Sequence, residues 1–151
     1  IQRNLELVGG PTFDGAEQEF ARALQASFGV EPRGMSDEVV PFDPGRAPEP
    51  GGSTDVANIS WVTPTAELEI ACWPIDVPAH SWASTAASGH PSGERGMLRA
   101  AEVLALSTLE LFDDPAAVAA ARAEFARSTA DFEYRSPVGA DDAPSLPSSM
   151  R

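Results

Sequence analysis

Residues 67–73 read ELEIACW, and this stretch decides the fold that we expect. Its apolar side chains alternate in part with its two glutamates, which is the pattern of a half-buried β-strand. A second short strand is predicted at 59–63, where β-branched and aromatic residues gather and Pro64 ends the run. Residues 39–42 form a further β-like run. These strands favour an α/β fold with a mixed sheet flanked by helices.

Three segments have the apolar spacing of helices. The first ends at Gly29 and starts with Asp14 and Glu17 in a capping-box arrangement. The second covers about 94–112, and the third begins at Pro115 behind an aspartate cap. The second helix carries one stripe that consists of Met97, Ala101, Leu104, Thr108 and Leu111. So few strands make a poor independent sheet, so we expect this chain to complete a sheet that another polypeptide supplies.

The composition argues against two classes of partner. The chain has 151 residues and a net charge of −13, which disfavours nucleic acid and anionic membranes. No apolar run approaches the roughly 18 residues of a membrane span. Cys72 is the only cysteine, and a reducing, cytoplasmic location is therefore expected. Residues 1–135 are predicted to form a segment of one domain, and 136–151, rich in Pro and Ser, an extended tail.

His80 is the residue best placed to carry chemistry. It follows the strand predicted at 67–73 and precedes residues 83–93, which are small and polar and are predicted to form a loop. Open α/β sheets place their sites at such positions, outside the ends of their strands. A neutral imidazole is the commonest metal ligand, although a lone histidine is more often a hydrogen-bonded structural residue. His90, between Gly89 and Pro91, is expected to be an exposed loop residue.

A glycine-led polar loop lies upstream of His80. It consists of Gly51, Gly52, Ser53, Thr54 and Asp55. Glycines let the backbone approach a ligand closely, and the hydroxyls and the carboxylate can line a substrate. The same residues also suit a turn followed by a helix cap. A triad of Ser53 or Ser81, His80, and Asp55 or Asp76 would make a serine hydrolase, but no nucleophile elbow surrounds either serine.

Three motifs follow one another in a specific order. Residues 52–65, 79–82 and 96–101 read GSTDVANISWVTPT, AHSW and GMLRAA. Together they resemble the zinc-dependent amidohydrolases of the aminoacylase/carboxypeptidase G superfamily. The resemblance spans almost the whole chain, which looks like the C-terminal third of those longer proteins.

The resemblance implies a site with two zinc ions, or manganese or cobalt in their place, for which His80 is the last histidine ligand. It also implies a role at the substrate end of the site for Gly52, Ser53, Thr54 and Asp55. A larger partner chain would carry the remaining ligands, the general-base glutamate and the lid domain, and residues 1–8 would form the return strand from that lid. Relatives often have Gly-His-Lys-Gly-Met where residues 93–97 of this chain read GERGM. Glu94 thus stands where those relatives have a histidine, and a role of that histidine in the site is in doubt here.

We therefore expect the smaller chain of a zinc-dependent amidohydrolase that hydrolyses an N-acyl or aryl amide. It would work only with its larger partner, in a higher oligomer of the two-chain unit. Zinc would polarise the carbonyl and lower the pKa of a bound water toward about 7. A non-catalytic, fold-completing subunit that does not use His80 is the alternative, and metal content separates the two. A serine hydrolase is a weaker alternative, which a chelator would leave active.

Overall fold

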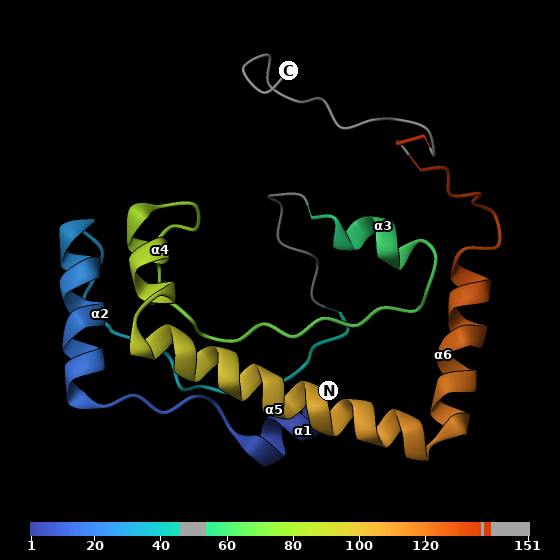
Figure 1. The fold of residues 1–151 in the computed structure, drawn as a ribbon, viewed down its shortest axis with the longest axis horizontal. Coiled ribbons are helices and arrows are strands. Elements are labelled where there is room, and N and C mark those ends of the chain that lie inside the picture. Colours follow the sequence, from blue (N-terminus) through green and yellow to red (C-terminus); the bar gives the residue numbers. More distant parts are fainter. Residues whose placement is uncertain (46–53, 137, 140–151) are drawn as a thin grey trace, which may run out of the picture. The chain divides into compact units, whose positions relative to one another are not determined.

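The structure is a computed structural model that describes residues 1–45, 54–136 and 138–139. This part of the chain forms six helices, which are labelled in Figure 1. They are α1 (Gln2–Val8), α2 (Gly15–Ser27), α3 (Val56–Ser60), α4 (Trp82–Ser88), α5 (Pro91–Asp113) and α6 (Pro115–Ser128). None of these helices is long and apolar enough to cross a membrane.

The chain divides into two compact units. The described part of the first unit is 1–45 and 66–115, and that of the second is 54–65, 116–136 and 138–139. Most of the tail predicted at 136–151 lies outside the described residues.

The predicted α/β fold is wrong, because the described residues form no strand and no sheet. Residues 67–73 pair with no other strand, 59–60 belong to α3, and 1–8 form α1 instead of a return strand. The alternation itself is present, since Leu68 and Ile70 are half-buried while the glutamates on either side are exposed. A strand also needs a ladder of backbone hydrogen bonds to a neighbour, and a pattern of burial does not supply one.

The three helices predicted from apolar spacing are confirmed as α2, α5 and α6. The capping box of α2 is present: the Glu17 N–H donates to Asp14 Oδ1 at 2.9 Å, and the Asp14 N–H donates to Glu17 Oε2 at 2.8 Å. Helix α4 lies in a stretch that the sequence predicts to be a loop. Ser81 caps it, with Oγ accepting from the Ser84 N–H at 3.1 Å.

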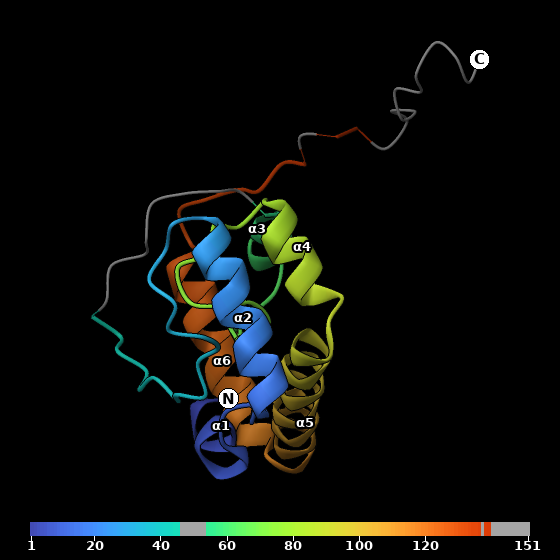
Figure 2. The same cartoon turned by 90° about the vertical axis from the view of Figure 1, so that its left-hand side faces the viewer.

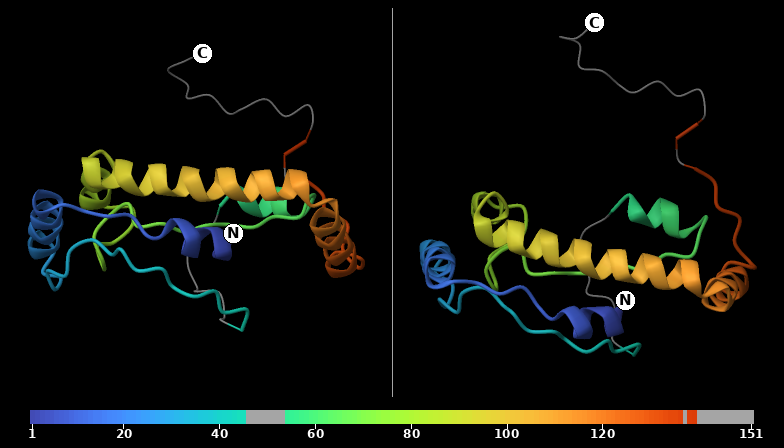
Figure 3. Two further views of the ribbon diagram at one scale, coloured as in Figure 1. Left: turned by 90° about the horizontal axis from the view of Figure 1, so that it is seen from below. Right: turned by 60° about the horizontal axis from the view of Figure 1, so that its bottom comes forward.

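The core of the first unit lies between α2, α4 and the segment that precedes α4. Its buried side chains are Leu24, Val77, Ala83 and Ala87, with Phe20 and Phe28 packed against them. Figure 2 shows α4 beside α2, as these contacts require. Helix α1 lies along the second half of α5, as Figure 3 shows, and Asn4 Nδ2 donates to Ser107 Oγ and Glu110 Oε2, both at 3.0 Å. Short helices are thus fixed onto the long helix α5.

Two glutamines on α2 hold the extended segment that follows it. Gln25 is fully buried; its Oε1 accepts from the Gly34 N–H at 2.7 Å, and its Nε2 donates to the Ile75 carbonyl at 2.8 Å. Gln18 bonds both backbone groups of Met35, at 2.9 and 3.3 Å. An amide side chain carries a donor and an acceptor, so each glutamine satisfies backbone groups that a neighbouring strand would otherwise bind.

Replacing Gln25 by leucine is expected to lower the free energy of unfolding by about 2 kcal/mol, because the buried N–H of Gly34 and the partly buried carbonyl of Ile75 lose their partner. Gln18→Leu is the matched control, and its loss of stability should be about half as large. Gln18 is only partly buried, so water can replace its hydrogen bonds to Met35. Urea denaturation measures both. An equal loss for the two variants would contradict this explanation.

In the second unit, two side-chain contacts join the region of α3 to the segment that follows α6. The rings of Trp61 and Phe132 lie 4.1 Å apart between centroids, and the Tyr134 hydroxyl donates to Asn58 Oδ1 at 3.0 Å. Neither α3 nor α6 has a buried residue. Its helices therefore gain little of the apolar burial that stabilises helices in folded proteins.

Candidate functional site

His80 lies in the turn that leads into α4, and its side chain is exposed. Its φ of 57° is in the left-handed region, which is uncommon for a residue other than glycine. The next residue, Ser81, uses its hydroxyl to cap α4 and to donate to the Pro78 carbonyl at 2.7 Å. Because that hydroxyl serves the backbone of the turn, Ser81 is poorly suited to be a nucleophile.

The turn before His80 is anchored to the first unit at several points. The side chain of Val77 is in the core, with 4% of its surface exposed. Asp76, which also has a positive φ of 58°, forms an ion pair with Arg33. The Ile75 N–H donates to the Gly34 carbonyl at 3.1 Å. The structure therefore holds the backbone near His80 in place while it leaves the imidazole accessible.

The described residues do not by themselves form a metal site. Nowhere in them do three His, Cys, Asp or Glu side chains come together in a group that could hold a metal ion. A zinc site needs three or four protein ligands, and His80 supplies one suitable nitrogen. A metal at His80 would therefore need ligands from outside the described residues.

The residues predicted to line the substrate are only partly described. Gly52 and Ser53, like Gly51, lie outside the described residues, whereas Thr54 and Asp55 are exposed just before α3. Thr54 Oγ1 accepts from the Val56 N–H at 3.3 Å, and Asp55 makes no capping bond to α3. Thr54 thus takes part in the turn, and the Asp55 carboxylate is not needed to cap the helix.

Cys72 is half-buried beside α5, where a Cβ at Gly96 would lie 2.8 Å from its sulfur. Burial raises the pKa of the Cys72 thiol, so less of the reactive thiolate forms at neutral pH. These features agree with a packing role for the thiol.

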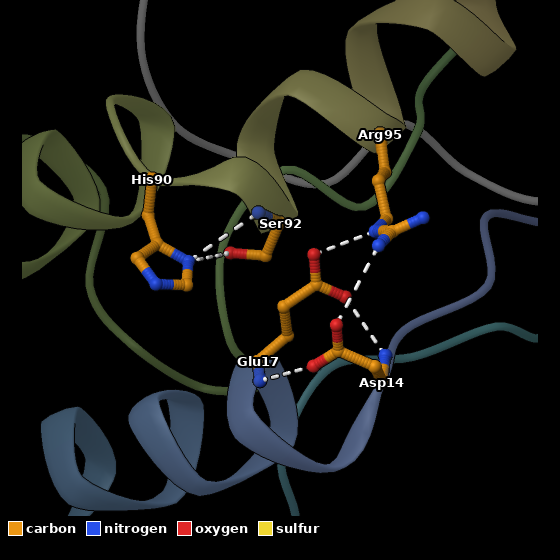
Figure 4. Close-up of polar contacts among 5 residues, drawn as sticks. All are labelled: Asp14, Glu17, His90, Ser92 and Arg95. Atoms are coloured by element: carbon orange, nitrogen blue, oxygen red, sulfur yellow. Dashed lines mark hydrogen bonds and ion pairs between the residues drawn. The ribbon is translucent and has the colours of Figure 1, made fainter.

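A polar cluster at the start of α5, drawn in Figure 4, was not predicted from the sequence. The Glu17 side chain is 4% exposed, and it accepts from Arg95 Nε at 2.6 Å. Arg95 also lies 3.6 Å from Asp14 Oδ2. The hydrogen bond to Glu17, followed by the charge of Glu17, raises the pKa of Arg95. Because each charged group has a partner, the cluster suits a clasp between α2 and α5 better than a catalytic site.

His90 is a structural residue, and its prediction as an exposed loop residue is wrong. It is the N-cap of α5, and its Nδ1 accepts from the Ser92 N–H at 3.3 Å (Figure 4). Its ring stacks on Phe20 with the centroids 4.0 Å apart. The following Pro91 is the available sequence signal, because proline favours the first position of a helix.

Comparison with known proteins gives a distant similarity. Over 93 residues the chain is 30% identical to one of the subunits of p-aminobenzoyl-glutamate hydrolase from Escherichia coli (strain K12). The match covers 62% of this chain and 19% of that protein, so the chain spans only a small part of the relative. No protein-family profile and no solved structure matches the chain. The similarity supports a distant relation to this hydrolase subunit.

Proposed function

We propose that this chain is part of a zinc-dependent amidohydrolase and that His80 is one of the metal ligands. The observation that carries the proposal is the backbone of His80, which has a positive φ on an anchored turn while the side chain is exposed. Such a conformation costs on the order of 1 kcal/mol or more, and strained residues of this kind cluster at functional sites. The similarity to part of a hydrolase supports the same assignment.

The contribution of this chain would be to hold one metal-binding nitrogen in place. Zinc, when bound, supplies polarisation of the amide carbonyl and a bound water with a pKa near about 7. The remaining ligands, the general-base glutamate and the lid would belong to a larger partner chain in a cytoplasmic, higher-order assembly. N-acyl amino acids and aryl amides such as p-aminobenzoyl-glutamate are the proposed substrates, with Gly52, Ser53, Thr54 and Asp55 beside them.

Removal of the metal tests this proposal. The assembled protein is expected to lose hydrolysis of p-aminobenzoyl-glutamate and of N-acetyl amino acids when a chelator removes its zinc. Added zinc, manganese or cobalt should restore the activity, because metal-ligand binding is reversible. Elemental analysis and product assays are run on the same samples. Activity that survives complete removal of the metal would favour a serine hydrolase, and an assembly without zinc or hydrolysis would favour a fold-completing role.

Replacing Asp55 by alanine tests the substrate loop. Turnover is expected to fall at least about tenfold, which corresponds to about 1.4 kcal/mol of transition-state stabilisation. The melting temperature and the zinc content should stay the same, since Asp55 makes no capping bond to α3. Thr54→Val is the control, because it removes the Thr54 Oγ1 bond to the Val56 N–H and so acts on the turn. A loss of stability in Asp55→Ala that matches its loss of activity would contradict a substrate role.

A further inference from the structure

Helix α5 has two faces of opposite character. Its buried face consists of Ser92, Gly93, Gly96, Val103 and Ser107. The large apolar side chains that α5 exposes, which we call the outer face, are Met97, Leu98, Leu104, Leu109, Leu111 and Phe112. The exposed fraction of these large apolar side chains runs from 46% at Leu104 to 79% at Phe112.

Three residues of the outer face form a stripe along the helix. Met97, Leu104 and Leu111 recur at intervals of seven residues, two helical turns, and therefore lie above one another. Ala101 lies between Met97 and Leu104, Thr108 lies between Leu104 and Leu111, and both are exposed too. The stripe therefore runs along most of α5. Contiguous apolar surface of this kind marks interaction sites, whereas single exposed apolar residues need no explanation.

The sequence of this chain disfavours two candidates for what covers the outer face. The segments outside the described residues carry little to cover the stripe, since 46–53 has no large apolar side chain and 140–151 has only Leu146 and Met150. A second copy would bring a further net charge of −13 to the contact, and a net charge far from zero keeps proteins monomeric.

We propose that the outer face is the surface through which this chain docks onto an apolar surface of a different, less acidic polypeptide. That polypeptide is the larger chain of the proposed hydrolase, so this inference rests on the proposed function. The similar protein supports this occupant, because its name makes it one subunit of a hydrolase, which implies a further chain beside it.

Two methionines in this chain give an internal test of whether the outer face is covered. Met97 is 59% exposed and Met35 is 5% exposed, and both have the same intrinsic chemistry. The assembled protein is purified through a tag on this chain, treated with dilute hydrogen peroxide, and digested for mass spectrometry. Met97 is expected to form sulfoxide as slowly as Met35, within about twofold, because its partner covers it. Oxidation of Met97 about tenfold faster than that of Met35 in the assembly would overturn the proposal.

A pair of exposed residues gives the matched variants. Leu104→Glu is expected to weaken assembly at least about tenfold, since a charge would enter an apolar contact. Phe42→Glu should have no effect, although Phe42 is 73% exposed, because it lies outside α5. Circular dichroism checks that both variants keep their helices. Equal effects of the two variants would overturn the proposal, as would a native mass that contains only copies of this chain.

These results separate this inference from the proposed function. Protection of Met97 and the effect of Leu104→Glu are measured without metal or substrate. If His80 is not a ligand, zinc content and hydrolysis fail while Met97 stays protected. If the outer face is not the docking surface, Met97 is oxidised while zinc and hydrolysis remain.

Discussion

Replacing Gly96 by alanine is expected to lower the free energy of unfolding by about 3 kcal/mol, although alanine is the better helix former. A Cβ at this position would meet the carbonyl oxygen of Ala71 far inside van der Waals contact, and it would lie 2.8 Å from Cys72 Sγ. The carbonyl belongs to the backbone, so no change of rotamer relieves the overlap. Inserting a methyl group into such a contact costs about 1–3 kcal/mol, and a backbone partner places Gly96 at the upper end.

Gly15 in α2 is the matched control for Gly96. A Cβ at Gly15 would have no atom within 4 Å, so Gly15→Ala is expected to raise the free energy of unfolding by about 0.5–1 kcal/mol. Urea denaturation of both variants should therefore give shifts of opposite sign. Stabilisation by Gly96→Ala would contradict the packing of residues 66–73 against α5.

The helices could be predicted because their signals are local. Asp14 and Glu17 stand three residues apart and cap the same turn, so the sequence alone identifies the start of α2. Helix α4 has only seven residues, and its buried side consists of small residues, Ala83, Ser84 and Ala87, which explains why the sequence predicts a loop there. Strands depend on a partner elsewhere in the chain, so the alternation at 67–73 could not establish a sheet.

The same distinction between local and long-range signals explains what could be predicted of the candidate site. His80 could be identified from its place between an apolar run and small residues, but its positive φ could not. The bond between Arg95 and Glu17 joins residues 78 positions apart, and no local pattern indicates it. For α5, the sequence identified the apolar stripe through Met97, Leu104 and Leu111, and the structure shows that these side chains are exposed. The apolar spacing therefore identifies one face of α5, but it does not identify what covers that face.

Replacing His80 by glycine is expected to abolish hydrolysis by the assembled protein, with a loss of at least about a thousandfold, and to lower the zinc it binds. Stability should be unchanged or up to about 1 kcal/mol higher, because glycine adopts a φ of 57° without the cost that a side chain adds. Glycine thus removes the imidazole without straining the turn, which makes it a sharper test than alanine.

Replacing His90 by alanine is expected to lower stability and to leave activity unchanged, which is the opposite of the result expected for His80→Gly. It removes the cap on α5 and the stacking on Phe20, so the free energy of unfolding should fall by about 1–2 kcal/mol. Zinc content and hydrolytic activity per folded molecule should stay at the level of the unaltered protein. His90 caps α5 and stacks on Phe20, and it is not part of the turn that contains His80. Elemental analysis, product assays and thermal melts on both variants give the comparison. Full zinc content and activity in His80→Gly would show that His80 is not a metal ligand, because the loss of a ligand weakens the binding of the metal.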